Sequence, residues 1–179
     1  MKTKEVLDKY RKILSGLLGS DYKPEDIRFF KSCKDSYFGI TTSLDRLPKS
    51  FTEIGSFEYE DKPKDEHNVI NWSEGTYAVY AKETVLSTFK LYRMPHCCGI
   101  LISCNAFVNK EFRGKRVGTT LNMLRQDIGR VLGYSLLMCT DISQNAPQRK
   151  LLATNGWTDL KSFKNKRTGN TVFVSSINL

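Results

Sequence analysis

The hydrophobic and polar positions of the first 72 residues predict one helix. Four apolar residues recur there at helical spacing: Val6, Tyr10, Ile13 and Leu17. Gly19 follows at the place where a left-handed cap would end the helix. The periodicity weakens between residues 29 and 72, and the segment EYEDKPKDEH (58–67) is typical of an exposed charged loop. The sequence therefore predicts an N-terminal amphipathic helix and assigns no element to residues 29–72.

The pattern then changes to strands. Segments GTYAVYA (75–81) and TVLSTFKLYRM (84–94) are rich in β-branched and aromatic residues and are joined by the dipeptide KE, as in a hairpin. In the next segment, CCGILISCNAFV (97–108), Leu101 and Phe107 would lie on one face. The other face would carry Ile100, Ile102, Cys104, Ala106 and Val108. Apolar residues on both faces predict a central strand that is covered on both sides.

A helix, a second buried strand and a further helix follow in the predicted order. An apolar stripe indicates the first helix, which Gly133 would end: Val117, Leu121, Leu124, Ile128 and Leu132. The segment YSLLMCT (134–140) predicts a second buried strand. Asn145 is placed to cap a helix that carries Pro147 in its first turn and ends at Gly156.

A hairpin closes the chain in this interpretation. The segments WTDLKSF (157–163) and TVFVSSI (171–177) have strand-like composition and flank KNKRTGN. Gly169 and Asn170 suit a turn that requires positive φ.

Composition changes this picture mainly through charge. A chain of 179 residues with 40% hydrophobic content fits one compact domain (1–179). The formal net charge of +9 favours an anionic ligand or partner, such as a nucleotide cofactor, a nucleic acid or an acidic protein. No run of about 18 apolar residues is present, and Met1 leads into a charged segment instead of a signal peptide. We therefore expect a cytoplasmic protein without membrane contact.

The loop FRGKRVGT (112–119) joins the predicted central strand to the predicted helix. A helix N-terminus carries unpaired amides and about half a positive charge, so such a loop can bind a diphosphate. The spacing differs from the P-loop GxxxxGK followed by Ser or Thr, and from the GxGxxG of a dinucleotide fold. Nucleoside triphosphate and NAD are therefore disfavoured as ligands.

Residues 106–157 resemble the Gcn5-related N-acetyltransferase (GNAT) family. The family signature is Arg or Gln, two residues, Gly, one residue, then Gly or Ala, and Arg113 and Gly118 occupy its outer positions. Downstream, Asn145 and LLATNGW (151–157) are similar to the family's N..A..LYEKLGF helix. The chain departs from the family twice: Arg116 replaces the first glycine, and Leu152 replaces a tyrosine that serves many members as general acid.

The resemblance implies an α/β fold with a mixed, mainly antiparallel sheet, helices on both faces, and a cleft after the central strand. Acetyl-CoA would be the co-substrate, and an amine of an unidentified acceptor would attack its thioester directly. Residues 73–179 would form the core that binds acyl-CoA, and the divergent residues 1–72 would shape the acceptor site. The resemblance further implies cofactor contacts by the pantetheine-binding pair Phe107 and Val108, by the pyrophosphate-binding loop Arg113, Gly114, Lys115, Arg116, Val117, Gly118 and Thr119, and by Asn145.

The general base is not evident from the sequence. Residues 100–108 contain no carboxylate or histidine. His96 and Asp141 could reach the cleft directly or through water, and Ser143 could donate a proton, although each also has a purely structural reading. We expect no metal site, because His67 is the only histidine besides His96. The five cysteines form no CxxC pair and are expected to be reduced: Cys33, Cys97, Cys98, Cys104 and Cys139.

Two alternatives remain open beside amine acetylation. The chain could be an inactive module of this fold that binds nucleic acid or protein, or an acyltransferase that modifies a nucleic-acid base or an aminoacyl-tRNA. Leu152 and the missing base would permit the inactive module. The charge suggests RNA or an acidic acceptor, through a basic set that adds to the loop charges, namely Arg149, Lys150, Lys161, Lys164, Lys166 and Arg167. Trp157 and Phe163 lie among these charges, but we expect packing to bury both, which disfavours stacking on bases.

Overall fold

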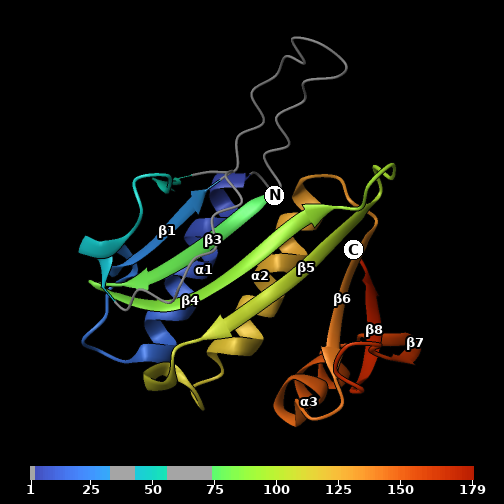
Figure 1. The fold of residues 1–179 in the computed structure, drawn as a ribbon. Helices are drawn as coiled ribbons and strands as arrows, with labels where there is room; N and C mark the ends of the chain where they lie inside the picture. Colours follow the sequence, from blue (N-terminus) through green and yellow to red (C-terminus); the bar gives the residue numbers. More distant parts are fainter. Residues whose placement is uncertain (1–2, 33–42, 56–73) are drawn as a thin grey trace.

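The structure is a computed structural model, and it describes residues 3–32, 43–55 and 74–179 (Figure 1). The sequence interpretations that concern Cys33, His67 and residues 58–67 lie outside the described residues.

Eight strands form one mixed sheet in the described part of the chain. They are β1 (Ile27–Ser32), β2 (Thr52–Glu53), β3 (Gly75–Ala81), β4 (Thr84–Arg93), β5 (Ile100–Val108), β6 (Leu136–Ile142), β7 (Thr158–Lys164) and β8 (Thr171–Asn178). The order across the sheet is β2-β1-β3-β4-β5-β6-β8-β7. Among the described strands, only β5 and β6 pair in parallel, and the other pairs are antiparallel. The predicted mixed, mainly antiparallel sheet is confirmed, and β1 is a strand that the hydrophobic pattern left unassigned.

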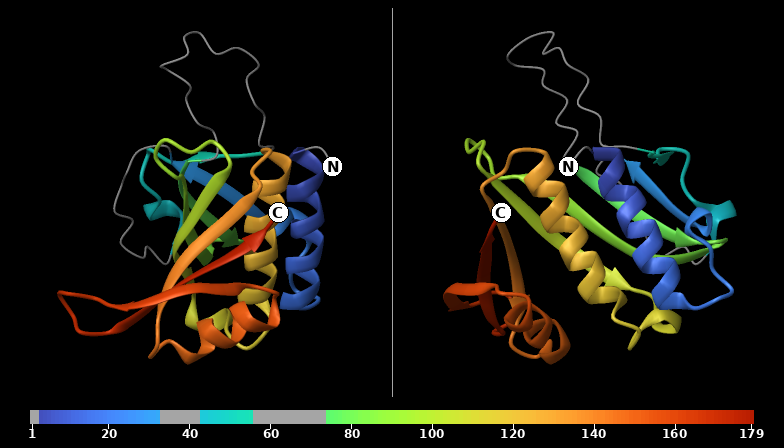
Figure 2. Two further views of the ribbon diagram at one scale, coloured as in Figure 1. Left: turned by 90° about the vertical axis from the view of Figure 1, so that its right-hand side faces the viewer. Right: turned by 180° about the vertical axis from the view of Figure 1, so that it is seen from behind.

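Two long helices lie side by side on one face of this sheet (Figure 2). The helices are α1 (Thr3–Leu18), α2 (Val117–Val131) and the shorter α3 (Ala146–Thr154), with single turns at η1 (Pro24–Asp26), η2 (Leu44–Arg46) and η3 (Lys110–Phe112). A second, smaller apolar cluster includes Ala78 and Tyr80 and is covered by Leu44, Leu47 and Phe51. The short turn η2 and the residues that follow it therefore cover this smaller cluster, where no long helix of the described chain lies.

The helix α1 is packed through a face slightly different from the predicted stripe. Val6, Tyr10 and Leu14 are fully buried, whereas Ile13 is 37% exposed. The rotation follows from contacts with two partners, because α1 packs on α2 as well as on the sheet. The phenol of Tyr10 donates to Asp127 Oδ2 of α2 at 2.9 Å.

The central strand β5 contains a β-bulge. Lys90 of β4 lies opposite Cys104, but Thr88 lies opposite Phe107, so β5 carries one extra residue at this point. Asn105 takes a φ of 51° within the bulge. The sequence predicted a strand that is covered on both faces. This prediction is wrong for the end of β5, because the bulge interrupts the alternation of its side chains and Asn105 and Ala106 are exposed.

The elements after β5 follow the predicted order. Gly133 and Gly156 both have positive φ, at 79° and 78°, and each lies two residues after the last residue of its helix, α2 and α3 respectively. The closing hairpin is present, but β7 is exposed along its whole length. Trp157 is buried as expected, while Phe163 is 48% exposed, because β7 is an edge strand with no described element over it. None of the described helices is long and apolar enough to cross a membrane.

Candidate active site

The strands β5 and β6 separate part-way along their length. Their pairing runs from Ile100 opposite Leu136 to Ser103 opposite Cys139 and ends there. Both strands continue, β5 to Val108 and β6 to Ile142. Figure 1 shows them together near the start of β5 and diverging toward its end. The facing backbone groups beyond Ser103 no longer bond to each other, which leaves space for a ligand between the strands. The carbonyls of Phe107 and Val108 accept from Oγ of Ser87 and from Nε of Arg113 instead.

A cavity of about 1080 Å³ opens where the strands separate. Its walls come from the end of β5, the loop before α2, the first part of α2 and the length of α3, with Ser87 and Phe89 of β4 also contributing. Ligand cavities usually have volumes of about 300–1,000 Å³, so this one can hold a large cofactor.

The loop before α2 presents backbone amides to this cavity. Gly114 has a φ of 78°, and Arg116 has a φ of 60° immediately before the helix. The first helical hydrogen bond runs from the amide of Thr120 to the carbonyl of Arg116, at 3.0 Å. The amides of residues 117–119 therefore have no acceptor within the helix, and all three residues line the cavity. This is the arrangement that binds phosphate at a helix N-terminus.

Gly118 allows α2 to lie close to its neighbours. A Cβ at this position would be 3.3 Å from Cδ1 of Leu151 in α3 and 3.8 Å from Cγ2 of Val108 in β5. Arg116, in contrast, adopts a left-handed conformation that costs a non-glycine residue about 1 kcal/mol. A glycine at this position, as in the family signature, would adopt the left-handed conformation without strain. In this chain the arginine adopts the same backbone conformation.

The cavity wall is positively charged. Arg113, Arg116, Arg125 and Lys150 line it, and no Asp, Glu or His does so among the described residues. The Nε of Arg113 donates to the carbonyl of Val108 at 2.9 Å, and its guanidinium lies 5.5 Å from the ring centre of Phe107. These contacts hold the loop against the end of β5. A wall of this kind favours a ligand with several negative charges.

Nine of the ten residues predicted to bind the cofactor line this one cavity: Phe107, Val108, Arg113, Gly114, Arg116, Val117, Gly118, Thr119 and Asn145. The tenth, Lys115, is exposed in the same loop outside the wall. Asn145 also caps α3, because its Oδ1 accepts from the amide of Gln148 at 3.4 Å.

His96 is the first of the three predicted catalytic candidates, and it lies far from the cavity. It occupies an exposed turn before β5, with a φ of 59°. The first residue of β5 that lines the cavity is Ala106, six residues beyond Ile100, which is about 20 Å along a strand. The structure therefore does not bring His96 together with the predicted cofactor loop.

Asp141 is buried on β6 and contacts Arg149 instead of the cavity. The Nη1 of Arg149 donates to Oδ1 of Asp141 at 3.3 Å and to Oδ1 of Asp159 at 2.9 Å. The Oδ2 atom of Asp141 is buried without a hydrogen-bond partner among the described residues. Burial raises the pKa of the Asp141 carboxyl above its usual value, although Arg149 opposes this effect. Ser143 is exposed after β6 and donates to Oε1 of Gln144 at 3.1 Å.

Leu152 occupies the position of the family's tyrosine and is part of the core. It is 2% exposed and does not line the cavity. The hydroxyl groups that do line it belong to Ser87, Thr119 and Thr154. Residue 152 therefore cannot act as a general acid, which is the role of the tyrosine in many members of the family.

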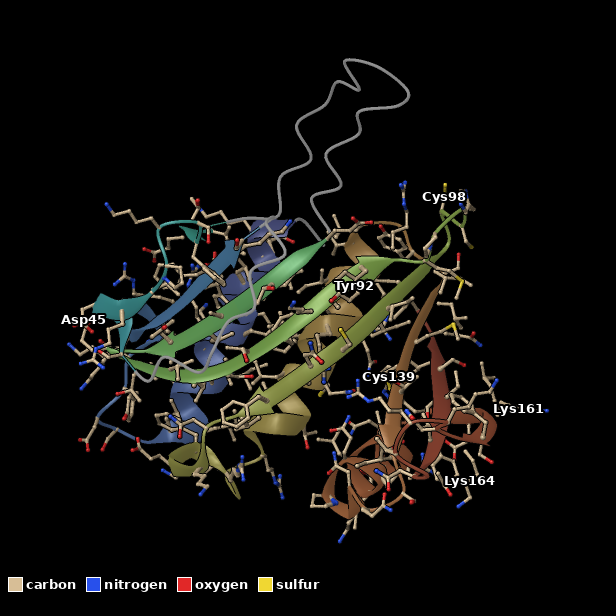
Figure 3. All side chains as sticks on the ribbon, viewed as in Figure 1. Asp45, Tyr92, Cys98, Cys139, Lys161 and Lys164 are labelled. Atoms are coloured by element: carbon tan, nitrogen blue, oxygen red, sulfur yellow. The ribbon has the colours of Figure 1, made fainter. Side chains whose placement is uncertain are left out.

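The predicted basic set is divided among three places. Arg149 is ion-paired to Asp141 and Asp159, and Lys150 lines the cavity. Lys161 and Lys164 project from β7, away from α2 (Figure 3). The predicted basic residues therefore do not all lie on one continuous surface.

Arg125 is a cavity residue that the sequence interpretation missed. Its position was visible, because it lies four residues after Leu121 and three before Ile128, within the apolar stripe of α2. A charge inside an apolar stripe signals a buried polar contact or a site.

Comparisons with known proteins agree with this architecture. No protein-family model and no curated protein matches the sequence. Solved structures do match. An IAA acetyltransferase from Bacillus cereus has a TM-score of 0.51 over 64% of this chain and 85% of its own, at 14% identity. An acetyltransferase of the GNAT family from Streptococcus pneumoniae has a TM-score of 0.53 over 60% of this chain and 68% of its own, at 10% identity. The chain has the GNAT acetyltransferase fold.

A further structure with this GNAT fold contains a cofactor. It comes from Salmonella typhimurium, is described as an acetyltransferase with its cofactor acetyl-CoA, and has a TM-score of 0.52. The match covers 68% of this chain and 78% of that one, at 15% identity.

Proposed function

We propose that this protein transfers an acetyl group from acetyl-CoA to an amine. The observation that carries the proposal is the cavity at the separation of β5 and β6, where free amides of α2 and four cations face the same space. Acetyl-CoA combines a polyanionic nucleotide with a thin arm, which suits a basic wall beside two diverging strands. The bound acetyl-CoA of the Salmonella typhimurium structure supports the same choice of co-substrate.

The pyrophosphate binds at the N-terminus of α2 in this proposal. The amides of residues 117–119 donate to it, and Arg113 and Arg116 supply charge, with Lys115 nearby. The arm extends along the end of β5 that no longer pairs with β6, at Phe107 and Val108, and Asn145 contacts it from the start of α3. The thioester then lies toward the point where β5 and β6 meet.

The reaction is a direct acyl transfer. The acceptor nitrogen attacks the thioester carbonyl, a C–N bond forms, the C–S bond breaks, and the CoA thiolate leaves and takes up a proton. Positioning of the two reactants and backbone N–H groups of β5 that bond the carbonyl oxygen supply most of the acceleration. No carboxylate or histidine lines the described cavity, so solvent is the simplest proton acceptor. Asp141, acting through water, is the stronger of the two base candidates, and Ser143 remains a candidate donor.

The chain forms one functional unit in this proposal. Residues 73–179 supply the acyl-CoA site, and residues 1–72 shape the acceptor side. The anchoring of α1 on α2 through Asp127 supports the single unit, because the N-terminal helix supports the helix that carries the cofactor loop.

Turnover of acetyl-CoA with an amine panel tests the proposal. Release of the CoA thiol is measured with small amines, peptides and RNA fractions as acceptors, for the wild type and for Gly118→Trp. The proposal predicts amine-dependent release that Gly118→Trp abolishes, because the indole would occupy the space between Leu151 and Val108. Release confined to RNA would favour the RNA-modifying alternative, and no release with any acceptor would contradict the proposal.

A further inference from the structure

The side chain of Arg125 lies at the inner end of the cavity. Arg125 is eight residues beyond Val117, which is about 12 Å along α2 from the predicted phosphate-binding amides. The residue is only 5% exposed, yet it lines the cavity. The guanidinium is therefore a buried charge that faces ligand space.

The contacts of Arg125 place its guanidinium where the two strands begin to separate. Its Nη1 donates to Oγ of Ser103 at 2.7 Å, and its Nε donates to the carbonyl of Leu121 at 3.1 Å. Ser103 is the last residue of β5 that pairs with β6. The ring of Phe89 lies nearby, with its centre 5.8 Å from the guanidinium carbon.

The positive charge of Arg125 has no counter-ion in the described part of the chain. Its hydrogen-bond acceptors are neutral, and it forms none of the ion pairs among described residues. Burial raises the pKa of the nearby Cys139 thiol to about 12, so this thiol is neutral at pH 7. Figure 3 shows Cys139 on β6 beside the separation. Burial also lowers the pKa of Arg125 to about 10, which leaves it cationic.

A buried charge without a counter-ion is costly, and hydrogen bonds to neutral acceptors such as Ser103 do not require that charge. Arg125 falls within the apolar stripe between Leu121 and Ile128, where an apolar side chain would pack without any charge. Even a buried ion pair can often be replaced by hydrophobic residues of similar volume with a neutral or stabilising effect. Of the five guanidinium N–H groups, two are used by Ser103 and Leu121, and three remain for a ligand.

We propose that Arg125 binds a carboxylate of a substrate at the inner end of the cavity. The planar fork of a guanidinium matches a carboxylate and bonds it through two parallel N–H groups. The inference rests on the proposed function, which places the phosphates of CoA at the N-terminus of α2 and the acyl end near Ser103. The carboxylate belongs either to the acyl chain, as in a dicarboxylic acyl-CoA, or to the acceptor, as in an α-amino acid.

Two matched comparisons test this inference and separate the sources. In the first, calorimetry compares succinyl-CoA with butyryl-CoA, which has the same chain length and lacks the carboxylate. In the second, thiol release from acetyl-CoA compares glycine, alanine and leucine with their carboxamides as acceptors. Both are repeated with Arg125→Met, and with Arg125→Lys in case the methionine variant does not fold. Circular dichroism confirms the folded state of each variant.

The inference predicts that the wild type prefers the carboxylate by about 10-fold or more in one comparison. A preference for succinyl-CoA assigns the carboxylate to the acyl chain, and a preference for the free amino acids assigns it to the acceptor. In either case, the preference falls at least fivefold in Arg125→Met. Absence of both preferences in the wild type, or a preference that both variants retain, would overturn the inference. Acetyl-CoA binding by the same wild-type sample shows whether the proposed function still stands.

Discussion

The guanidinium of Arg125 in α2 and the hydroxyl of Ser103 in β5 are joined by a 2.7 Å hydrogen bond at the point where β5 and β6 separate. The bond connects the helix that follows the loop of residues 112–116 to the last paired residue of the parallel strands. Both residues are nearly inaccessible to solvent, at 5% and 1% exposure.

Ser103→Ala is expected to destabilise the protein by about 1–3 kcal/mol, because it leaves a buried charged donor without its acceptor. Urea unfolding at pH 7 measures the change. Ser143→Ala is the matched control, because Ser143 is exposed and its loss should change the free energy of unfolding by no more than about 0.5 kcal/mol. Equal effects of the two substitutions would show that the bond does not contribute to stability.

Arg116→Gly is expected to separate stability from binding. Glycine relieves the strain of a φ of 60°, so the free energy of unfolding should stay unchanged or rise by up to about 1 kcal/mol. Affinity for acetyl-CoA should fall, because a cation is removed from the cavity wall. Arg116→Ala removes the same charge but keeps the strain, so it should bind as weakly and be less stable than Arg116→Gly. Unchanged affinity in both variants would exclude a phosphate contact by Arg116.

Asp127→Ala is expected to loosen α1 from α2 at a cost of about 2–4 kcal/mol, because Asp127 accepts from Lys9 and from the buried Tyr10. Burial favours the neutral carboxyl, but hydrogen bonds from Lys9, Tyr10 and Arg130 outweigh it and lower the pKa of Asp127. The stabilisation is therefore present above about pH 4 and is lost as the pH falls through the lowered value. Unfolding curves between pH 7 and pH 3 should show a smaller pH dependence for the variant than for the wild type.

Asp141→Asn and Asp159→Asn should have different effects on stability, although both carboxylates contact Arg149. The hydrogen bond from Arg149 lowers the pKa of Asp159 to about 2, so its stabilisation is lost between about pH 4 and pH 2. The pKa of Asp141 is raised by burial, so its charged form is disfavoured in the folded state. At pH 7, Asp159→Asn should lower the melting temperature, and Asp141→Asn should maintain or raise it.

The Asp141→Asn variant also tests the proposed general base. A lower acetylation rate in the folded variant at every pH would support Asp141 as the base. An acetylation rate that the substitution does not change would leave solvent as the proton acceptor.

The elements after residue 74 could be predicted because their signals are local. Periodicity, caps and glycines fix β3 to β8 and both C-terminal helices, and the loop of residues 112–119 lies between a strand and a helix as expected. The bulge at Asn105 could not be predicted, because it depends on how β5 registers with β4. Exposure of Phe163 likewise depends on β7 being at the sheet edge.

The residues that line the cavity could be predicted in part from the sequence. A sequence motif covers Arg113 to Thr119, and these residues are neighbours in the chain. The role of Arg125 depends on Ser103, which is 22 residues away and belongs to another element. The pairing of Asp141 with Arg149 across the β6–α3 connection similarly depends on the folded arrangement.

Calorimetric binding of acetyl-CoA tests the central claim most directly, with wild type, Gly118→Trp and Gly16→Trp compared at one pH. Gly16 is an exposed glycine of α1, and a Cβ added there would meet no atom within 4 Å, so its variant carries the same added indole away from the cavity. The account predicts that the wild type and Gly16→Trp bind acetyl-CoA equally, and that Gly118→Trp binds at least about 100-fold more weakly. No binding by the folded wild type, or equal binding by all three proteins, would contradict it.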